Sequence, residues 1–271
     1  MKKVLLALFF ISPALAFAQG ALPQIEVFVY DTLRTFDSKT PNDQYLKIYS
    51  KSGKIYKMGR QLNGKKEGLW KVYYESGMLS NVTEYHEDTP NGMSLAFDVT
   101  GYLSKELTMK NGVIEGLTHE YLRNGVMKSE ENYKNGVLNG WRRSFGLDGK
   151  LQEEGQWKNG KRDSINRWAY PSGKLYVEYS YKDGSITGSA KTYWENDKVK
   201  SSGDFLDGYE EGIWKEFFEN GNLNAQGKYL HGKKTGIWKI YLDDGTTMEK
   251  TQEYDATGNI IKKTMKTAAK K

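Results

Sequence analysis

The chain has 271 residues, a formal net charge of +6, 13% aromatic residues and no cysteine. The lack of cysteine excludes disulfide bonds, thiol catalysis and thiolate metal sites. The net charge is small for this length and no nucleic-acid-binding motif is present, so we expect no nucleic-acid partner.

Residues 1–18 are typical of a cleavable secretory signal peptide. Lys2 and Lys3 precede an apolar run at positions 4–11, and Ala16 and Ala18 are small residues just before the expected cut. The run is too short for a good membrane span, no later segment qualifies, and no cysteine lies near the cut to carry a lipid anchor. We therefore expect an exported protein, periplasmic or secreted, without a transmembrane segment in the mature chain.

Residues 19–43 are predicted to be an N-terminal capping segment, because residues 25–30 form an apolar, β-branched and aromatic stretch typical of a strand. At the other end, residues 259–271 are rich in lysine and are predicted to be a solvated basic tail. The repeat domain lies between them, at residues 44–258.

Three glycine series and an aromatic series recur in this domain with a period of 24 residues. One glycine series runs Gly68, Gly92, Gly116, Gly140, Gly188, Gly212 and Gly236, with Ser164 in the missing place. A second series contains Gly77 and a third contains Gly64. A fixed period of this length identifies a repeat protein.

Two stretches of strand length lie between the glycines of each unit, separated by turn dipeptides such as Ser76-Gly77 and Asn63-Gly64. Each unit is therefore predicted to be one β-hairpin, and it must be stabilised by stacking on its neighbours. The predicted fold class is all-β: an elongated, open antiparallel ribbon of about nine stacked 24-residue hairpins.

If the loop at Ser76-Gly77 has two residues, counting outward from it fixes the cross-strand pairs, and an aromatic ring is expected to lie over each strand glycine. The glycine pairs are Gly68 with Tyr85, Gly116 with Tyr133, Gly140 with Trp157, Gly188 with Phe205 and Gly212 with Tyr229. The apolar pairs beside the loop are Tyr74 with Leu79, Leu122 with Met127, Tyr170 with Leu175, Trp194 with Val199 and Phe218 with Leu223. The charged pairs on the opposite face are His119 with Glu130, Arg143 with Glu154 and Arg167 with Glu178.

The unit reads Asn-Gly, three variable residues, Gly-x-Trp-x-x-Tyr, a turn, Gly-x-Leu and a later Tyr, as at residues 63–74 and 231–241. This pattern resembles the MORN-repeat variant family of bacteria over nearly all of the mature chain. Bacterial members are commonly catalogued as antitoxin-like proteins of the YwqK type. The resemblance implies a β-hairpin ribbon with a binding role and supplies no catalytic residues. The tryptophan is missing at residues 93–94, 164–166 and 189–190.

No set of catalytic residues is recognisable. His86, His119 and His231 occupy different phases of the repeat in distant units, and His119 takes a position otherwise filled by lysine or arginine. No nucleophile elbow, phosphate loop or zinc spacing is present. We predict a non-enzymatic protein without a metal or cofactor.

A basic series at one phase of the repeat predicts a stripe along one face of the ribbon. Its members, besides His119, are Lys47, Lys71, Arg143, Arg167, Lys191, Lys215 and Lys239. One interpretation is an elongated site for an acidic protein, anionic lipid head groups or a charged glycan. The other, favoured by the predicted pairs with glutamate, is a strand face kept soluble and protected from edge pairing.

Most aromatic residues recur at fixed phases and are predicted to pack in the core. Trp70, Trp194, Trp214 and Trp238 stand at positions that are not uniformly aromatic, so we predict these four as exposed contacts for a protein, a sugar or a quaternary ammonium group. The candidate partner-binding residues are these tryptophans with Lys71, Arg143, Arg167, Lys191, Lys215 and Lys239.

Two functions follow from these patterns. The favoured one is an exported scaffold that binds a protein, in the manner of an antitoxin or immunity partner in a toxin–antitoxin system. The alternative is a cell-envelope module that binds a glycan, a choline-like group or an anionic lipid.

Overall fold

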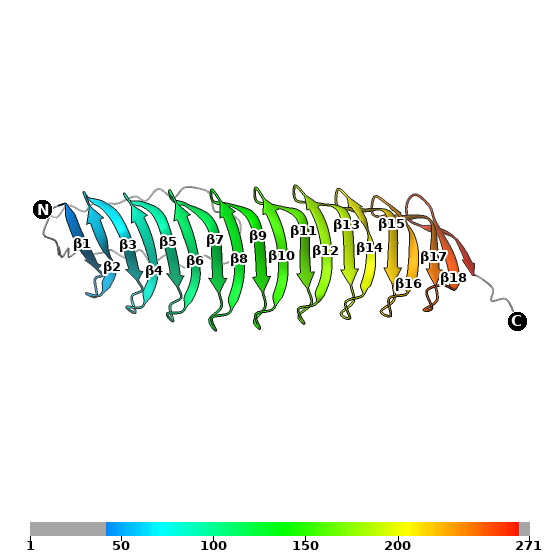
Figure 1. Cartoon of the computed structure of the whole chain (residues 1–271), viewed down its shortest axis with the longest axis horizontal. Helices are drawn as coiled ribbons and strands as arrows, with labels where there is room; N and C mark the ends of the chain where they lie inside the picture. The colour runs from blue at the N-terminus through cyan, green and yellow to red at the C-terminus, as the bar shows by residue number, and fades with distance from the viewer. Residues whose placement is uncertain (1–41, 266–271) are drawn as a thin grey trace.

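The computed structural model describes residues 42–265, which form one open sheet of 19 antiparallel strands. Each strand pairs with its neighbours in the chain, from β1 with β2 to β18 with β19. Figure 1 shows the resulting elongated ribbon, in which the strands are curved and stand side by side along the long axis. The predicted fold class and the predicted stack of hairpins are confirmed.

The strands have similar lengths throughout. Their bounds are β1 Asp43–Tyr49, β2 Ile55–Leu62, β3 Lys65–Tyr73, β4 Leu79–His86, β5 Thr89–Phe97, β6 Leu103–Lys110, β7 Val113–Tyr121, β8 Met127–Lys134, β9 Val137–Phe145, β10 Leu151–Lys158, β11 Lys161–Ala169, β12 Leu175–Lys182, β13 Ser185–Tyr193, β14 Val199–Leu206, β15 Tyr209–Phe217, β16 Leu223–Leu230, β17 Lys233–Tyr241, β18 Met248–Tyr254 and β19 Ile260–Met265.

The two ends of the hairpins use different turns. Between β2 and β3, Asn63 and Gly64 have φ of 50° and 82°, as the tight two-residue turn requires. Between β3 and β4, the N–H of Gly77 donates to the carbonyl of Tyr74 and the N–H of Tyr74 donates to the carbonyl of Met78, both at 2.8 Å. This loop has three residues, with Gly77 in the left-handed conformation at φ 90°. The predicted two-residue loop is therefore wrong at this end.

A second irregularity compensates for the longer loop. Tyr73, and not Tyr74, pairs with Leu79, and a bulge at Ser80 then restores the register so that Val72 pairs with Asn81. The five predicted apolar pairs at the loops are wrong by this one position, as in Tyr121 with Met127 and Phe217 with Leu223. Beyond the bulge, all five predicted glycine pairs and all three predicted charged pairs are confirmed.

The glycine series that begins at Gly68 marks a wider bulge. Across the β2–β3 pair, Gly59 pairs with Trp70 and Arg60 pairs with Glu67, so Gly68 and Leu69 face no residue of β2. Glycine is favoured because φ is +66°, and not because a ring covers it: a Cβ at Gly68 would have nothing within 4 Å. Ser164 adopts a similar φ of 55° at the same phase. The predicted stacking of Tyr85 on Gly68 is therefore wrong, although the pairing is right.

Buried side chains lie almost entirely on the face that carries Trp70, which we call the inner face; the opposite one is the outer face. Trp238 is 1% exposed and lies against Gly227, where a Cβ would come within 2.3 Å of the ring. Its indole N–H donates to the carbonyl of Lys228 at 3.2 Å, beside the bulge. Trp70 on Gly59 and Trp214 on Gly203 repeat this arrangement.

Edge-to-face and tilted ring contacts join Trp214 and Trp238 to neighbouring aromatic rings in a ladder along the C-terminal part of the inner face. Its members are Trp168, Tyr179, Phe205, Trp214, Tyr229, Trp238 and Tyr254, with ring centroids 5.2–6.5 Å apart. A sheet without a second layer thus buries its apolar surface between repeats.

The predicted signal peptide, residues 1–18, lies outside the described residues, as does nearly all of the capping segment. The predicted C-terminal tail differs from the structure in its first half. Ile260–Met265 form β19, which pairs with β18 from Tyr254↔Ile260 to Lys250↔Met265, because the repeat continues its hairpin pattern beyond residue 258. All side chains of β19 are exposed.

Candidate functional site

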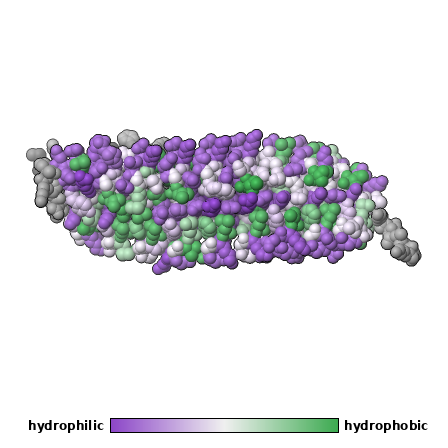
Figure 2. Space-filling model, viewed as in Figure 1, coloured by the Kyte–Doolittle hydropathy of each residue, from purple (hydrophilic) through white to green (hydrophobic). Residues whose placement is uncertain are grey.

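Three lengthwise rows of side chains make up the outer face. A central charged row contains the predicted basic series, and apolar side chains lie on both sides of it. Figure 2 shows this arrangement as a hydrophilic band that runs along the middle of the molecule between hydrophobic patches.

The middle of the charged row is a continuous ladder of alternating acids and bases. His119 lies between Glu106 and Glu130, with nitrogen–oxygen distances of 3.3 and 3.5 Å. Arg143 then joins Glu130 at 2.8 Å to Glu154 at 3.6 Å. Arg167 continues the ladder between Glu154 at 3.4 Å and Glu178 at 2.7 Å.

This ladder gives Arg143 and Arg167, which were predicted as partner-binding residues, a structural role. The carboxylate of Glu178 accepts a hydrogen bond from Arg167 and raises the pKa of the guanidinium. Arg143 and Arg167 each contact two carboxylates, so their charge is neutralised within the sheet. Partner binding through these two residues has no support in this geometry.

Five lysines of the same row make no ion pair within the part of the chain that the structure describes: Lys47, Lys71, Lys191, Lys215 and Lys239. Their cross-strand neighbours explain this. Lys215 faces Ser202 and Gln226, and Lys239 faces Gln226 and Thr251, none of which carries a charge. Lys191 faces Ser202 and Glu178, and the Glu178 carboxylate pairs with Arg167 instead. Three of the five, Lys191, Lys215 and Lys239, are consecutive members, so unpaired positive charge gathers over β13, β15 and β17.

Exposed aliphatic side chains follow the wide bulges along one flank of the charged row. The row consists of Leu69, Met93, Leu117, Ile165, Ile213 and Ile237. Ile213 and Ile237, beside the unpaired lysines, are both 59% exposed and are the most exposed members. Because the bulge removes cross-strand partners on one side, these side chains have less of the sheet to pack against.

A hollow of about 360 Å³ lies on the other flank, between β13 and β15. Phe217 and Val199 supply apolar lining, and Lys191, Lys198 and Ser202 supply polar groups. The unpaired lysines, the exposed isoleucines and this hollow together form what we call the C-terminal outer surface. Sequence reasoning identified its lysines but not the isoleucines or the hollow.

The tryptophans occupy other places than predicted. Trp70, Trp214 and Trp238 are 3%, 9% and 1% exposed on the inner face, so their prediction as exposed contacts is wrong. A signal was present in the sequence, since each ring lies on a glycine of the preceding strand, Gly59, Gly203 or Gly227, and these three stand at one phase of the repeat. Trp194 is half-buried; its indole N–H donates to the carbonyl of Phe217 at 3.1 Å, and the Lys200 ammonium lies 4.4 Å from its ring.

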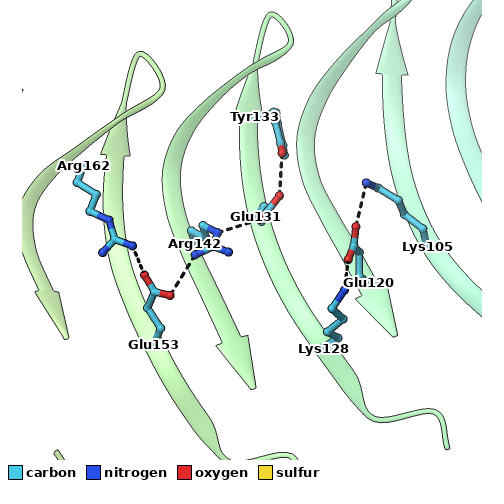
Figure 3. Close-up of polar contacts among 8 residues, drawn as sticks. All are labelled: Lys105, Glu120, Lys128, Glu131, Tyr133, Arg142, Glu153 and Arg162. Atoms are coloured by element: carbon cyan, nitrogen blue, oxygen red, sulfur yellow. Dashed lines mark hydrogen bonds and ion pairs between the residues drawn. The ribbon is translucent and has the colours of Figure 1, made fainter. Parts of the chain in front are cut away.

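The middle of the inner face carries a charge network that sequence analysis did not identify (Figure 3). Arg142 joins Glu131 at 2.9 Å to Glu153 at 3.2 Å, and Arg162 also contacts Glu153. Burial and the hydrogen bond to Glu131 raise the pKa of Tyr133 to about 12, so its hydroxyl stays protonated and donates to that carboxylate at 2.7 Å. The network replaces the aromatic rings found toward both ends of the inner face.

The three histidines stand apart, as their phases in the repeat predict. Among residues 42–265 no group of three or more His, Asp and Glu side chains is arranged to hold a metal ion. No helix in this range is long and apolar enough to cross a membrane.

The single sheet of repeated β-hairpins and its two faces define the class of protein: a β-hairpin repeat scaffold. Four segments match the family model described as MORN repeat variant, at residues 66–87, 114–135, 163–183 and 210–231. Each matched segment spans a β-hairpin at the same phase, in every second repeat. The resemblance to the MORN repeat variant is therefore confirmed.

No curated protein sequence matches the chain. One similar solved structure is described as the crystal structure of TcdB2-TccC3-Cdc42, with 12% identity and a TM-score of 0.18. The match covers 81% of this chain and 14% of that one, so the chain spans about one seventh of the length of that relative.

Proposed function

We propose that the protein is an exported, non-enzymatic scaffold whose C-terminal outer surface binds a protein partner. The observation that carries the proposal is the group of unpaired lysines Lys191, Lys215 and Lys239 beside the exposed Ile213 and Ile237. Apolar side chains ringed by charge are typical of protein-binding surfaces. Positive charge of this kind selects a partner with an acidic surface and accelerates its association.

The antitoxin-like role suggested by the sequence resemblance belongs to this proposal. An exported member requires a toxin that acts outside the inner membrane, and we propose an immunity-type partner of that kind. The ladder of carboxylates and guanidiniums gives no support to catalysis by its own members, because its charged groups satisfy one another.

A matched pair of charge-reversal variants tests the surface. The mature chain from Gln19 is immobilised and exposed to envelope extract, in parallel with K191E/K215E/K239E and with the control K71E. Lys71 belongs to the same row and also lacks an ion pair, but it lies far from the proposed surface. We expect one protein to be retained by the wild type and by K71E and lost from the triple variant, with retention weakening as salt is raised.

The retained protein is then purified and titrated against both variants. A complex of fixed stoichiometry that fails only with the triple variant supports the proposal. Binding of the wild type to anionic vesicles or wall glycan, with no protein retained, would replace it with the envelope-ligand function. Equal retention by all three chains places the interface elsewhere and overturns the proposal. The intact mass of the exported chain separately tests cleavage after Ala18.

A further inference from the structure

The inner face contains a repeated pairing of a cation with the ring of a tryptophan. Lys66 stands four residues before Trp70, and its ammonium lies 5.6 Å from that ring and 4.4 Å from the ring of Tyr85. Lys234 stands four residues before Trp238, at 3.7 Å. A cation over an aromatic face is attracted by the negative charge of the π system.

One repeat without the tryptophan keeps the same kind of contact. The guanidinium of Arg162, at the equivalent position, lies 4.8–5.8 Å from the rings of Trp157, Trp168 and Tyr181. On β3, β11 and β17, a lysine or arginine at this position therefore covers the aromatic rings of the inner face.

Glu210 breaks the series. It stands four residues before Trp214, which occupies the same environment as the other two tryptophans: it lies on Gly203 and its indole N–H donates to the carbonyl of Asp204 at 3.1 Å. The Glu210 side chain has no hydrogen bond or ion pair within residues 42–265. The position that holds a cation on β3, β11 and β17 therefore holds an unpaired carboxylate on β15.

A hollow of about 380 Å³ opens at this place on the inner face. Its aromatic lining includes Trp194, Trp214 and Tyr229, and its acidic lining is Glu210 and Glu216. Burial, with the nearby Glu216 and Glu210 carboxylates, raises the pKa of Tyr229 to about 12, so this ring stays neutral.

Two lysines border the site and bear on its charge. Lys200 is part of the lining, where its ammonium lies over Trp194. Lys234 contacts one oxygen of Glu216 at 3.3 Å while it covers Trp238. Lys234 also lies 5.9 Å from the ring of Tyr229. The lining itself thus carries two carboxylates and one ammonium, and no cation within residues 42–265 lies over the ring of Trp214.

We infer that this hollow binds an alkylammonium group from outside the chain, with its positive charge between the Glu210 carboxylate and the ring of Trp214. The group is supplied either by a lysine side chain of a partner or by a free quaternary ammonium compound; both present the same cation to the same ring. An anionic ligand would face two carboxylates. The site is on the opposite face from the C-terminal outer surface, so its test is independent of the proposed function.

The probes are choline, N-acetyl-lysine methylamide and 3,3-dimethyl-1-butanol, the neutral isostere of choline. Each is titrated into the mature wild-type chain while the ligand methyl resonances are followed by NMR. We expect at least one of the two cations to bind and the neutral isostere to bind at least about tenfold more weakly, since it keeps the shape but loses the charge.

E210K is the decisive variant, because it recreates the pairing of Lys66 with Trp70 and so fills the hollow with the chain's own cation. We expect it to weaken cation binding at least about tenfold, and E210Q to do so less. E219K, with the same charge change in an exposed turn outside the hollow, is the control and should retain binding. Circular dichroism establishes that each variant is folded.

The outcomes separate the sources of the cation and decide the inference. Binding of choline alone indicates a free quaternary ammonium ligand, and binding of the lysine derivative alone indicates a partner's side chain. No binding of either cation, equal binding of the isostere, or equal loss in E210K and E219K would overturn the inference.

Discussion

Lys57 shows how an isolated charge behaves on a face that is otherwise aromatic. Its ammonium lies 5.3 Å from the ring of Trp70, which Lys66 approaches at 5.6 Å. Burial first, and the neighbouring charge of Lys66 second, lower the pKa of Lys57 from 10.5 to about 8. The folded protein therefore holds this proton less tightly than the unfolded chain does.

The sign of this shift gives a pH-dependent prediction for K57M. The unfolded state binds more protons between pH 8 and 10.5, so this lysine makes the wild type gain stability as the pH rises through that window. We expect K57M to be more stable than the wild type at pH 7, with a difference that shrinks toward pH 10. Urea unfolding at both pH values measures it.

K71M is the control, because Lys71 is on the outer face and its contacts are with Met58 and Val82 across the strands. A stability difference for K57M that does not change with pH would show that methionine packing, and not the charge, accounts for the gain.

At the scale of the strand pair, a side-chain hydrogen bond reaches the last carbonyl of three odd strands, β5, β13 and β15. A turn aromatic of the preceding repeat is the donor: Tyr74 donates to the carbonyl of Phe97 at 2.8 Å, and Tyr170 donates to that of Tyr193 at 2.7 Å. The indole of Trp194 does the same for Phe217. These bonds tie one hairpin to the next at the loop end.

Y170F tests this tie. Removing the hydroxyl leaves the carbonyl of Tyr193 without its donor, and we expect a loss of about 1 kcal/mol in the free energy of unfolding. Y176F is a matched control, because Tyr176 packs edge-on against Tyr170 with centroids 4.9 Å apart but is 45% exposed and donates no hydrogen bond in the described chain. Equal effects of the two variants in thermal unfolding would argue against a role for the hydrogen bond.

At this same scale, the sequence predicts most of the strand register but little of the side-chain packing. Counting from the turns gives the register, because the extra loop residue and the bulge at Ser80 cancel. The wide bulge at Gly68 leaves no trace in that count, so the count does not pair Trp70 with Gly59. The lack of an ion pair at Lys215 could have been predicted, since the same count places it opposite the uncharged Gln226. The hollows depend on strand curvature, which no pair count contains.

At the scale of the whole molecule, each repeat contacts its sequence neighbours and the register is the property that all repeats share. Removing residues 209–232 joins Gly208 to Lys233 and leaves a two-residue turn between β14 and β17. Trp238 then pairs with Gly203, which already accommodates Trp214. We expect this deletion to fold, with a loss of about 1–4 kcal/mol for the missing repeat at roughly 0.05–0.15 kcal/mol per residue.

Removing residues 209–233 is the control. One residue fewer turns every side chain from β17 onward to the opposite face, so that Trp238 points outward. Circular dichroism and urea unfolding compare the two chains. If both deletions fold equally well, register does not determine the stability of the ribbon.

The exception at Glu210 has a meaning beyond its own hollow. Successive hairpins are related by a shift of about 9.6 Å, two strands at roughly 4.8 Å each, so the molecule is close to a one-dimensional lattice. A ligand that contacts only Lys191, Lys215 and Lys239 meets nearly the same surface after a shift of one repeat. Glutamate occurs once at its phase of the repeat, at residue 210. It distinguishes one repeat from all the others, so a ligand bound at Glu210 has a defined position along the ribbon.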